Sequence, residues 1–569
     1  MNTTKELTGY PSIDKPWMKW YKNDVETTCS TYNMYDEIWK NNKDHLDDIA
    51  LHYFGNKITY RKFFLMIQIA ENKFNTLGIK RGETVGFLSV MTPEIIVSFY
   101  ALNRMGVTLS LMDPRTSTES LAKYIQKANV KYLFVQDACS KAASDLLKVE
   151  KIGTVVEFST SQSMGSIVKL LYKLKSFSEK KNKGWIEYRK IKGTEAEEYH
   201  TIYNVENEPA LICYTGGTTG ESKGVLLSNR NVNSVADQFR GLTDGFQRQQ
   251  KWLTPSIPFI AYATICSLHM PLSYGMQCYI ELYDPKKMKD AVIKNRINHV
   301  AATPQFFEEL AKETKRDLSY LIMPTTGGDI LSEKTYQMVN KKLADGNCEW
   351  KLCNGYGMTE VSSGACISFT GNSNKAKSVG IPLLYTIVSV FDSVTGEELK
   401  IGERGEICIS GPGVMMGYLN DKQATAEVIK EHHGRRWMHT GDIGHIDQDG
   451  CVFIDGRIKR MIIRFDGVKI FPTLIEEKML TCQYISDCCC VAAKDENHEI
   501  GQVPVVFYTM TTDEKDMSII ETELRRISQE SLPEYSQPRA YKKIDELPRT
   551  NAGKVDYKKL EDMNSVDIQ

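Results

Sequence analysis

The sequence has almost no net charge, no apolar N-terminal leader and no long hydrophobic run that reads as a membrane span. A formal net charge of −1 over 569 residues gives no electrostatic reason to expect nucleic acid as a partner. The N-terminus, Met1-Asn-Thr-Thr-Lys-Glu, lacks the apolar core of a signal peptide. Residues 252–280 contain no Asp, Glu, Lys or Arg, but their prolines and polar residues predict buried strands and a pocket wall. We expect a soluble, cytoplasmic protein without a transmembrane segment.

The 14 cysteines form neither a disulfide pattern nor a metal motif. In a long chain without a secretion signal they are expected to be reduced thiols. The run Cys488-Cys-Cys490 resembles a ligand cluster. Because adjacent residues of a strand point to opposite faces, the three thiols cannot close on one ion. The run therefore predicts a buried strand.

The chain is too long for a single core and alternates strand-like with helix-like segments, which favours an α/β fold with layered, largely parallel sheet. From about Ile401 short strands and turns predict a small β-rich subdomain, and after Arg457 the pattern predicts a compact α+β tail. We expect a large N-terminal domain of several subdomains, residues 1–457, and a small mobile C-terminal domain, residues 458–569.

The basic segment 165–189 interleaves Ile167, Val168, Leu170, Leu171 and Leu174 with lysines at 169, 173 and 175. This spacing favours a surface helix that caps a domain. The alternative is a peripheral membrane contact for an apolar substrate.

The most informative segment is Tyr214-Thr-Gly-Gly-Thr-Thr-Gly-Glu-Ser-Lys-Gly224, which follows the apolar run Ala210-Leu-Ile-Cys213. Glycines let backbone N–H groups close on an anion, hydroxyls add donors or reach a metal, and Lys223 adds positive charge. No Gly-Lys-Ser/Thr triplet closes the segment, so it is a polyphosphate loop of a kind other than the Walker loop.

Four further motifs follow in order: Asn354-Gly-Tyr-Gly-Met-Thr-Glu360, His439-Thr-Gly-Asp442, Asp455-Gly-Arg457 and Leu547-Pro-Arg-Thr-Asn-Ala-Gly-Lys554. Together with the loop, they make the chain resemble, over essentially its whole length, the adenylate-forming (AMP-binding) superfamily of acyl-CoA synthetases, adenylation domains and luciferases. The resemblance implies ATP- and Mg²⁺-dependent conversion of a carboxylic acid to an acyl adenylate, followed by transfer to CoA.

The resemblance also implies a role for each matching residue. Lys554, Thr359 and Glu360 would be catalytic, Lys554 as a charge stabiliser between carboxylate and α-phosphate. Thr218 and Glu360 would hold the metal. Tyr356 would face the adenine, and Asp442 would bind the ribose with support from Arg457. The expected ATP-binding set is Thr215, Gly216, Gly217, Thr218, Thr219, Gly220, Lys223, Gly328, Asp329, Asn354, Tyr356, Asp442 and Arg457.

For the second step, the family rotates its C-terminal domain about a hinge, and the matching position here is Lys459. Gly467 matches the close approach of the pantetheine arm of CoA, although its Asp-Gly pair is also typical of a hairpin turn.

The acid pocket is expected at Phe259, Ala261 and Tyr262, a stretch without an acidic residue. Because an α-ammonium would be buried there without a partner, amino acids are disfavoured and an apolar acid is favoured. Gly216-Gly217 resembles fatty acyl-CoA synthetases, whereas the ending at Lys554 resembles peptide-synthetase adenylation domains.

The sequence thus favours a medium- or long-chain fatty acyl-CoA synthetase. Two alternatives stay open: a freestanding adenylation enzyme that loads an acyl carrier protein, and a catalytically inactive relative that binds nucleotide.

Overall fold

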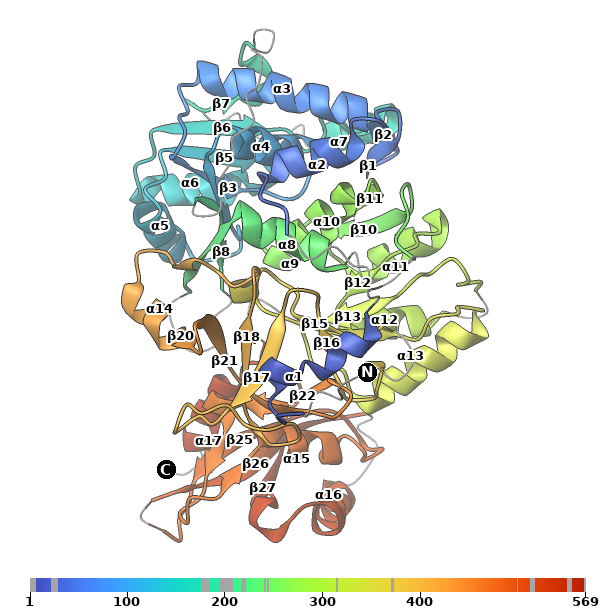
Figure 1. Ribbon diagram of the computed structural model, residues 1–569, viewed down its shortest axis with the longest axis vertical. Coiled ribbons are helices and arrows are strands. Elements are labelled where there is room, and N and C mark those ends of the chain that lie inside the picture. The colour runs from blue at the N-terminus through green and yellow to red at the C-terminus, as the bar shows by residue number, and fades with distance from the viewer. Residues whose placement is uncertain are drawn as a thin grey trace, which may run out of the picture.

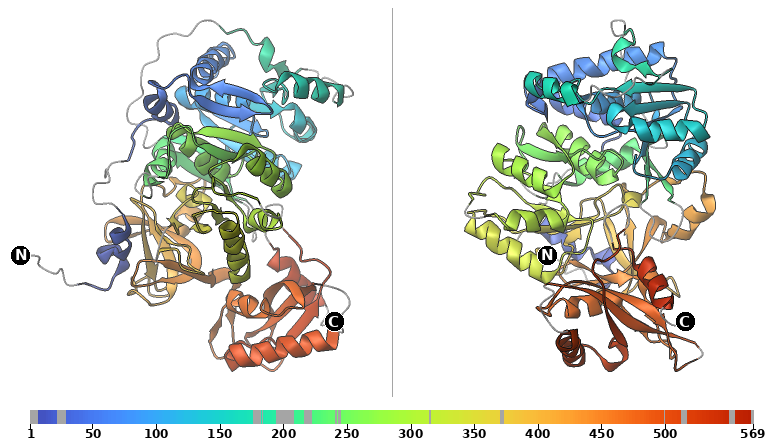
Figure 2. Two further views of the ribbon diagram at one scale, coloured as in Figure 1. Left: turned by 90° about the vertical axis from the view of Figure 1, so that its right-hand side faces the viewer. Right: turned by 180° about the vertical axis from the view of Figure 1, so that it is seen from behind.

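The computed structural model describes residues 7–21, 29–175, 182, 184–193, 208–215, 222–239, 242, 245–313, 316–369, 373–498, 500–511, 517–549 and 555–566. The chain stacks its parts along one long axis, with the N-terminal α/β part at one end and the C-terminal part at the other (Figure 1). The β-rich part lies between them, beside the sheet of residues 301–382 (Figures 1 and 2).

An eight-stranded sheet forms the core of the first part, in the order β19-β9-β8-β4-β3-β5-β6-β7. Strands β8, β4, β3, β5, β6 and β7 run parallel, and β9 returns antiparallel to β8. Its strands are β3 (Thr84–Leu88), β4 (Thr108–Met112), β5 (Tyr132–Gln136), β6 (Thr154–Phe158), β7 (Ile186–Glu187), β8 (Pro209–Tyr214), β9 (Gly224–Ser228) and β19 (Gly417–Tyr418).

Helices pack on both faces of this sheet, as parallel strands require. One of these helices begins at Pro93, where Thr92 caps it by accepting a hydrogen bond from the Ile95 N–H. The helices of this part are α2 (Met34–Asn42), α3 (Tyr60–Thr76), α4 (Pro93–Arg104), α5 (Thr118–Lys127), α6 (Ser140–Val149), α7 (Ser166–Lys175) and α8 (Asn229–Phe239).

A second sheet of order β10-β11-β1-β2 contains the ends of the uncharged stretch 252–280. Its strands are β1 (Ile49–Tyr53), β2 (Asn56–Thr59), β10 (Lys251–Pro255) and β11 (Gln277–Glu281). The residues between β10 and β11 are buried as expected but are helical: α9 (Ala261–Thr264), the π-helical turn η4 (Ile265–His269) and α10 (Met270–Ser273). None of the helices among the described residues combines the length and apolar character that a membrane span requires.

A third sheet contains the first residues of the motif Asn354–Glu360, in which Tyr356 is predicted to face the adenine. Its strands are β12 (Ala301–Ala302), β13 (Thr325–Gly327), β14 (Cys353–Tyr356), β15 (Cys366–Ile367) and β16 (Ile381–Pro382). The helices α11 (Pro285–Asn295), α12 (Pro304–Ala311) and α13 (Glu333–Asp345) pack beside it.

The β-rich subdomain is present but begins earlier than the sequence pattern suggested, at Ile387. Its strands are β17 (Ile387–Phe391), β18 (Gly405–Ser410), β20 (Ile429–His432), β21 (Arg435–Ile446) and β22 (Val452–Arg457), with α14 (Lys422–Val428) before β20. The N-terminal elements α1 (Pro11–Asp14) and η1 (Pro16–Trp20) pack on it, where Trp20 donates its indole N–H to the Asp449 carbonyl.

Beyond Arg457 the chain forms an α+β unit around the sheet β25-β26-β27. Its elements are η7 (Ile458–Arg460), β23 (Ile462–Ile463), β24 (Lys469–Ile470), α15 (Pro472–Met479), β25 (Ile485–Lys494), β26 (Gln502–Met510), α16 (Met517–Ser531), β27 (Ala540–Lys543) and α17 (Tyr557–Val566). Cys488, Cys489 and Cys490 lie buried within β25, so the predicted strand is confirmed. The unit has hydrophobic clusters of its own, which confirms the expected fold class.

Candidate nucleotide and acid site

The base of the predicted phosphate loop is held closed by hydrogen bonds between the end of β8 and the start of β9. The Thr215 N–H donates to the Lys223 carbonyl at 3.0 Å, and the Lys223 N–H donates to the Thr215 hydroxyl at 3.2 Å. The loop therefore leaves the carboxyl end of β8, a parallel strand, which is where α/β sheets bind ligands. Gly216, Gly217, Thr218, Thr219 and Gly220 lie outside the described residues, so their phosphate and metal contacts stay predictions.

Tyr418 connects this loop base to the predicted metal residue Glu360. The Lys223 Nζ lies 4.8 Å from the centroid of the Tyr418 ring, and the Tyr418 hydroxyl donates to Oε1 of Glu360 at 2.9 Å. Burial, together with the charge of Glu360, raises the pKa of Tyr418, so the phenol stays a donor. Tyr418 was missed in the sequence, where it reads as an ordinary strand residue.

The Glu360 carboxylate suits a divalent cation. It is buried in the short turn η5 (Thr359–Val361), and no described residue hydrogen-bonds its second oxygen, Oε2. A carboxylate held at one oxygen and open at the other is a hard oxygen ligand of the kind Mg²⁺ takes. Thr359 lies beside it on the same turn, as the sequence motif requires.

The predicted ribose residues come together around Asp442. Asp442 on β21 lies opposite Arg457 on β22, and the Arg457 Nε lies 2.7 Å from Oδ1 of Asp442. The Tyr356 hydroxyl donates to Oδ2 of the same carboxylate. Burial, and then the charge of Asp442, raise the pKa of Tyr356 far above its usual range, so this donor also stays protonated.

The residues predicted to lie at the edge of the adenine are found where β13 and β14 approach each other closely. A Cβ on Gly327 would meet the Gly355 carbonyl oxygen at 2.8 Å, and Gly328 follows with φ +81°, a conformation that favours glycine. The Asn354 amide donates to the Ser378 carbonyl at 3.1 Å and is thereby fixed in the sheet. Asp329 is exposed, and its charge acts on Asp487 of the C-terminal β25.

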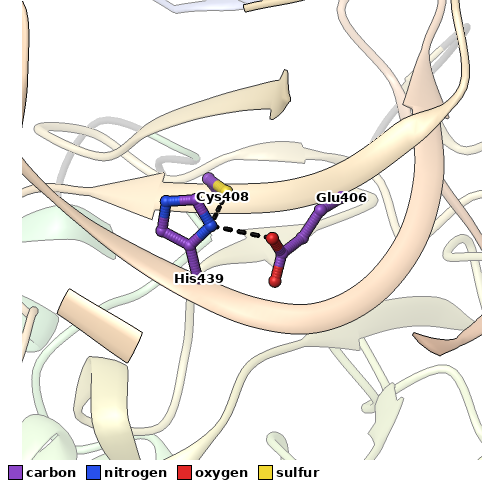
Figure 3. Close-up of side chains that lie close together, drawn as sticks. All are labelled: Glu406, Cys408 and His439. Atoms are coloured by element: carbon purple, nitrogen blue, oxygen red, sulfur yellow. Dashed lines mark hydrogen bonds and ion pairs between the residues drawn. The ribbon is translucent and has the colours of Figure 1, made fainter. Parts of the chain in front are cut away.

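Glu406, Cys408 and His439 form a buried cluster, the brace, that was not predicted from the sequence (Figure 3). Glu406 Oε2 lies 2.7 Å from His439 Nδ1, and Oε1 accepts from the Gly441 N–H at 2.9 Å. Cys408 Sγ lies 3.4 Å from the same imidazole nitrogen. The ligand atoms of the three side chains fall within 4.8 Å of one another, a spacing that would also suit a metal ion. Because Glu406 contacts His439 and Gly441, which directly precede Asp442, it fixes the irregular part of β21 that carries Asp442.

The predicted acid-pocket wall lies next to this centre. Phe259 packs with Ile257 and Ala263, and Tyr262 lies against them, whereas Ala261 belongs to the main core. The Tyr262 hydroxyl donates to the Ala301 carbonyl on β12. Cys266 Sγ lies 3.3 Å from the Ser363 hydroxyl, just after Glu360. The wall and the metal residue are therefore neighbours in the fold.

The hinge and CoA positions lie at the start of the C-terminal unit. Lys459 is exposed in η7, directly after Arg457. Gly467 has φ +80° and donates its N–H to the Arg464 carbonyl at 3.0 Å, so the hairpin turn expected from Asp-Gly is confirmed. Lys554 lies outside the described residues. Of the basic residues near this turn, Arg460 is paired with Glu476 and Arg464 with Asp466.

The layered α/β fold, with the hairpin of β8 and β9, the paired carboxylate of Asp442 and a separate C-terminal α+β unit, can be compared with that of known enzymes. The chain belongs to the AMP-binding enzyme family, which matches residues 38–419, and the C-terminal domain of these enzymes matches residues 474–554. The resemblance read from the motifs is thereby confirmed.

Curated relatives cover most of the chain. A long-chain-fatty-acid–CoA ligase of Bacillus subtilis is 24% identical over 95% of this chain and 96% of its own. A probable 4-coumarate–CoA ligase 1 of Dictyostelium discoideum is 28% identical over 86% of this chain and 87% of its own.

Solved structures share the fold. ATP-bound MatB from Rhodopseudomonas palustris superposes with a TM-score of 0.78 at 20% identity, over 94% of this chain and 99% of its own. The o-succinylbenzoate CoA synthetase MenE from Bacillus subtilis, with its acyl adenylate, gives a TM-score of 0.75 at 21% identity, over 92% of this chain and 97% of its own.

Proposed function

We propose that this protein is an acid–thiol ligase that uses ATP and Mg²⁺ to activate a medium- or long-chain fatty acid and transfers the acyl group to CoA. The observation that carries the proposal is the convergence of Asp442, Glu360 and the base of the phosphate loop beside an uncharged pocket wall. Family membership supplies the reaction type, and relatives named as acid–CoA ligases support CoA as the acceptor.

In the first step a carboxylate oxygen of the acid attacks the α-phosphorus of ATP, and the bond to pyrophosphate breaks. Asp442 would accept hydrogen bonds from the ribose hydroxyls while Arg457 balances its charge. Glu360 would hold Mg²⁺, which neutralises phosphate charge when bound. Thr359 would contact the α-phosphate, and Lys554 would place its ammonium between the two reacting anions.

In the second step the thiol sulfur of CoA attacks the acyl carbonyl and AMP leaves with its bonding electron pair. We propose that residues 458–569 rotate against residues 1–457 about Lys459 between the steps. The exposed position of Lys459 in the short turn η7 supports this, because a backbone rotation at that residue would not remove a buried side chain from its contacts. Gly467 would then lie beside the pantetheine arm.

The nature of the acid follows from the wall formed by Phe259 and its neighbours. Ile257, Phe259 and Ala263 are buried apolar residues, and the charged side chain recorded against this wall is the cation Arg115, 5.2 Å from the centroid of the Phe259 ring. A long aliphatic tail gains from burial here, at about 0.8 kcal/mol per methylene, while an α-ammonium would lose its hydration without gaining a partner.

The test is pyrophosphate release with a panel of acids, with and without CoA. We expect multiple turnovers with CoA and unbranched fatty acids of about eight or more carbons, with affinity rising by about 0.8 kcal/mol per methylene until the pocket ends. Glycine and alanine should give no pyrophosphate exchange. Accumulation of an adenylate that clears only when a carrier protein is added would replace the ligase by the carrier-loading alternative. Absence of pyrophosphate release with every acid would favour the inactive relative.

A further inference from the structure

A large apolar cavity begins beside the segment that leads into the predicted acid-pocket wall, since Ser256 lines the cavity and Ile257 belongs to the wall. Its volume is about 690 Å³, within the range of small-molecule pockets, and none of the candidate catalytic or nucleotide residues lines it. Met91, Met164, Val168, Leu171, Ile280 and Leu282 are among its lining residues. A cavity with this lining excludes strongly polar ligands and suits an aliphatic chain.

The cavity sits at the carboxyl ends of two parallel sheets. Tyr53 and Ile280 are register partners at the ends of β1 and β11, and Met91 follows β3. Ligands of α/β proteins bind at such carboxyl edges. The position is therefore that of a binding site and not of a packing defect in the core.

Helix α7 forms the outer wall. Val168, Leu171 and Tyr172 of α7 line the cavity, and Figure 1 shows the helix beside β1 and β2 at the edge of the molecule. The turn before α7 is tied to this edge, because the Asn56 amide donates to the Ser163 carbonyl and the Gly165 N–H donates to the Phe54 carbonyl.

The outer face of the same helix is apolar and exposed. Ile167, Leu170 and Leu171 are 78%, 61% and 59% exposed. Leu171 belongs to both surfaces, so the exposed apolar patch is continuous with the cavity wall. Neighbouring exposed apolar side chains of this kind mark an interaction surface.

The charges on and beside α7 indicate the kind of partner that its exposed apolar face would contact. Lys169 of α7 donates to the Gln162 carbonyl at 2.7 Å, and the sequence of the helix continues with two further lysines, Lys173 and Lys175. At the cavity, Glu281 is a lining carboxyl, and burial raises its pKa, which favours its neutral form and keeps charge out of the cavity. An amphipathic helix with apolar and basic residues lies in the surface of an anionic bilayer.

We propose that α7 docks on an anionic lipid bilayer and that the cavity beneath it takes up one aliphatic chain from that bilayer. The proposal stands on α7 and the cavity alone and does not depend on the proposed ligase activity. Because α7 has only ten residues, docking should be reversible and salt-dependent.

The first experiment is cosedimentation of the full chain with vesicles of equimolar phosphatidylcholine and phosphatidylglycerol. We expect binding that falls with added salt, is weak on pure phosphatidylcholine, and drops about tenfold in the double variant Ile167→Asp, Leu170→Asp. The matched control is Val394→Asp, since Val394 is 84% exposed in the turn after β17 and should bind as wild type does. Equal binding by the double variant and the wild type would overturn the proposal.

The second experiment tests the cavity. Transfer of a pyrene-labelled phospholipid chain from the vesicles to the protein is followed by loss of pyrene excimer emission. Leu282→Trp narrows the cavity at its partly exposed rim and should reduce transfer severalfold while vesicle binding is unchanged. Transfer that is unaffected by Leu282→Trp, or binding of monomeric fatty acid without any binding to vesicles, would contradict chain uptake from a bilayer.

Discussion

Asp442 and Arg457 face each other across the β21–β22 pair, with the Arg457 Nε 2.7 Å from the Asp442 carboxylate. Asp442 is almost fully buried, whereas the Arg457 side chain is about half exposed. The arginine therefore balances the carboxylate from the solvent side and leaves its inner face toward Tyr356. This arrangement holds a charged acceptor ready at one orientation.

The first prediction follows from that charge. Asp442→Asn keeps the shape but removes the charged acceptor, and hydrogen bonds to charged groups contribute about 1.5–3 kcal/mol. We expect the KM for ATP to rise about 10- to 100-fold, measured in a pyrophosphate exchange assay. The control is Glu431→Gln on the exposed part of β20, which should leave the KM unchanged. An unchanged KM in Asp442→Asn would remove Asp442 from the nucleotide site.

The second prediction concerns the brace behind Asp442. Glu406 holds His439 and the Gly441 N–H with its two oxygens, so Glu406→Gln loses one of these contacts and the charge. Glu406 positions the part of β21 that carries Asp442 and does not itself touch the substrate. The KM for ATP should therefore rise about 3- to 10-fold with kcat nearly constant. Glu406→Asp, which keeps the charge, should restore part of the loss. A fall in kcat of about 3- to 10-fold with an unchanged KM for ATP would contradict a positioning role.

The third prediction is a dependence of stability on pH. His269 is fully buried between the Tyr100 hydroxyl and Asn233, and burial lowers the pKa of His269 to about 4 from 6.5. Below pH 6.5 the unfolded chain takes up a proton at this residue while the folded chain does not. Stability is therefore lost as pH falls from about 6.5 to about 4, by up to about 1.4 kcal/mol per pH unit.

The measurement is the unfolding midpoint at pH 7 and pH 4.5. His299, whose pKa burial lowers to about 3, adds a loss of the same sign in the wild type. His269→Gln should therefore lower the midpoint at pH 7 but flatten its fall with pH. The exposed His433→Gln is the control and should follow the wild type. The same pH slope in His269→Gln as in the wild type would show that His269 titrates normally in the folded state.

Local patterns predicted much of the fold. The apolar runs before Tyr214 and around Cys489 formed the expected strands, because strand residues with one chemical character on both faces are buried. The uncharged stretch around Ser267 was harder to assign. With no charged residue to mark a period, a buried helix and a buried strand look alike, and the helices α9 and α10 with the π-helical turn were predicted as strands.

The residues of the candidate site also divide into those that the sequence predicted and those that it did not. Asp442, Arg457, Tyr356 and Glu360 were found because their motifs are local and matched a family in order. Glu406 and Tyr418 were missed because their partners are distant in sequence: the pairing of β18 with β21 brings Glu406 to His439, 33 positions away, and Tyr418 meets Glu360, 58 positions away, through tertiary packing. Such contacts depend on tertiary register, which a single sequence does not display.

The fourth prediction separates the two half-reactions at Lys554. Lys554 is proposed to stabilise the charge that develops in the first step. Lys554→Ala should therefore reduce adenylate formation by about 10²–10³-fold. The same variant given preformed acyl adenylate should still form the thioester with CoA at nearly the wild-type rate. The control is Lys558→Ala in the following helix, α17. Comparable loss in both half-reactions would show that Lys554 does not act in adenylation alone.

The last prediction tests Lys459 as the hinge. Proline fixes φ near −65° and restricts the preceding residue, so Lys459→Pro should hinder rotation after Arg457. The side chain is exposed in η7, and Lys459→Ala therefore serves as the control for losing the lysine without restricting the backbone. Pyrophosphate exchange should stay within about twofold of wild type in both variants, because adenylation precedes the rotation. Thioester formation should fall at least about tenfold in Lys459→Pro and remain close to wild type in Lys459→Ala. If exchange in Lys459→Pro fell as far as overall turnover, the residue would support the structure of both states, and the rotation axis would have to lie elsewhere in the chain after β22.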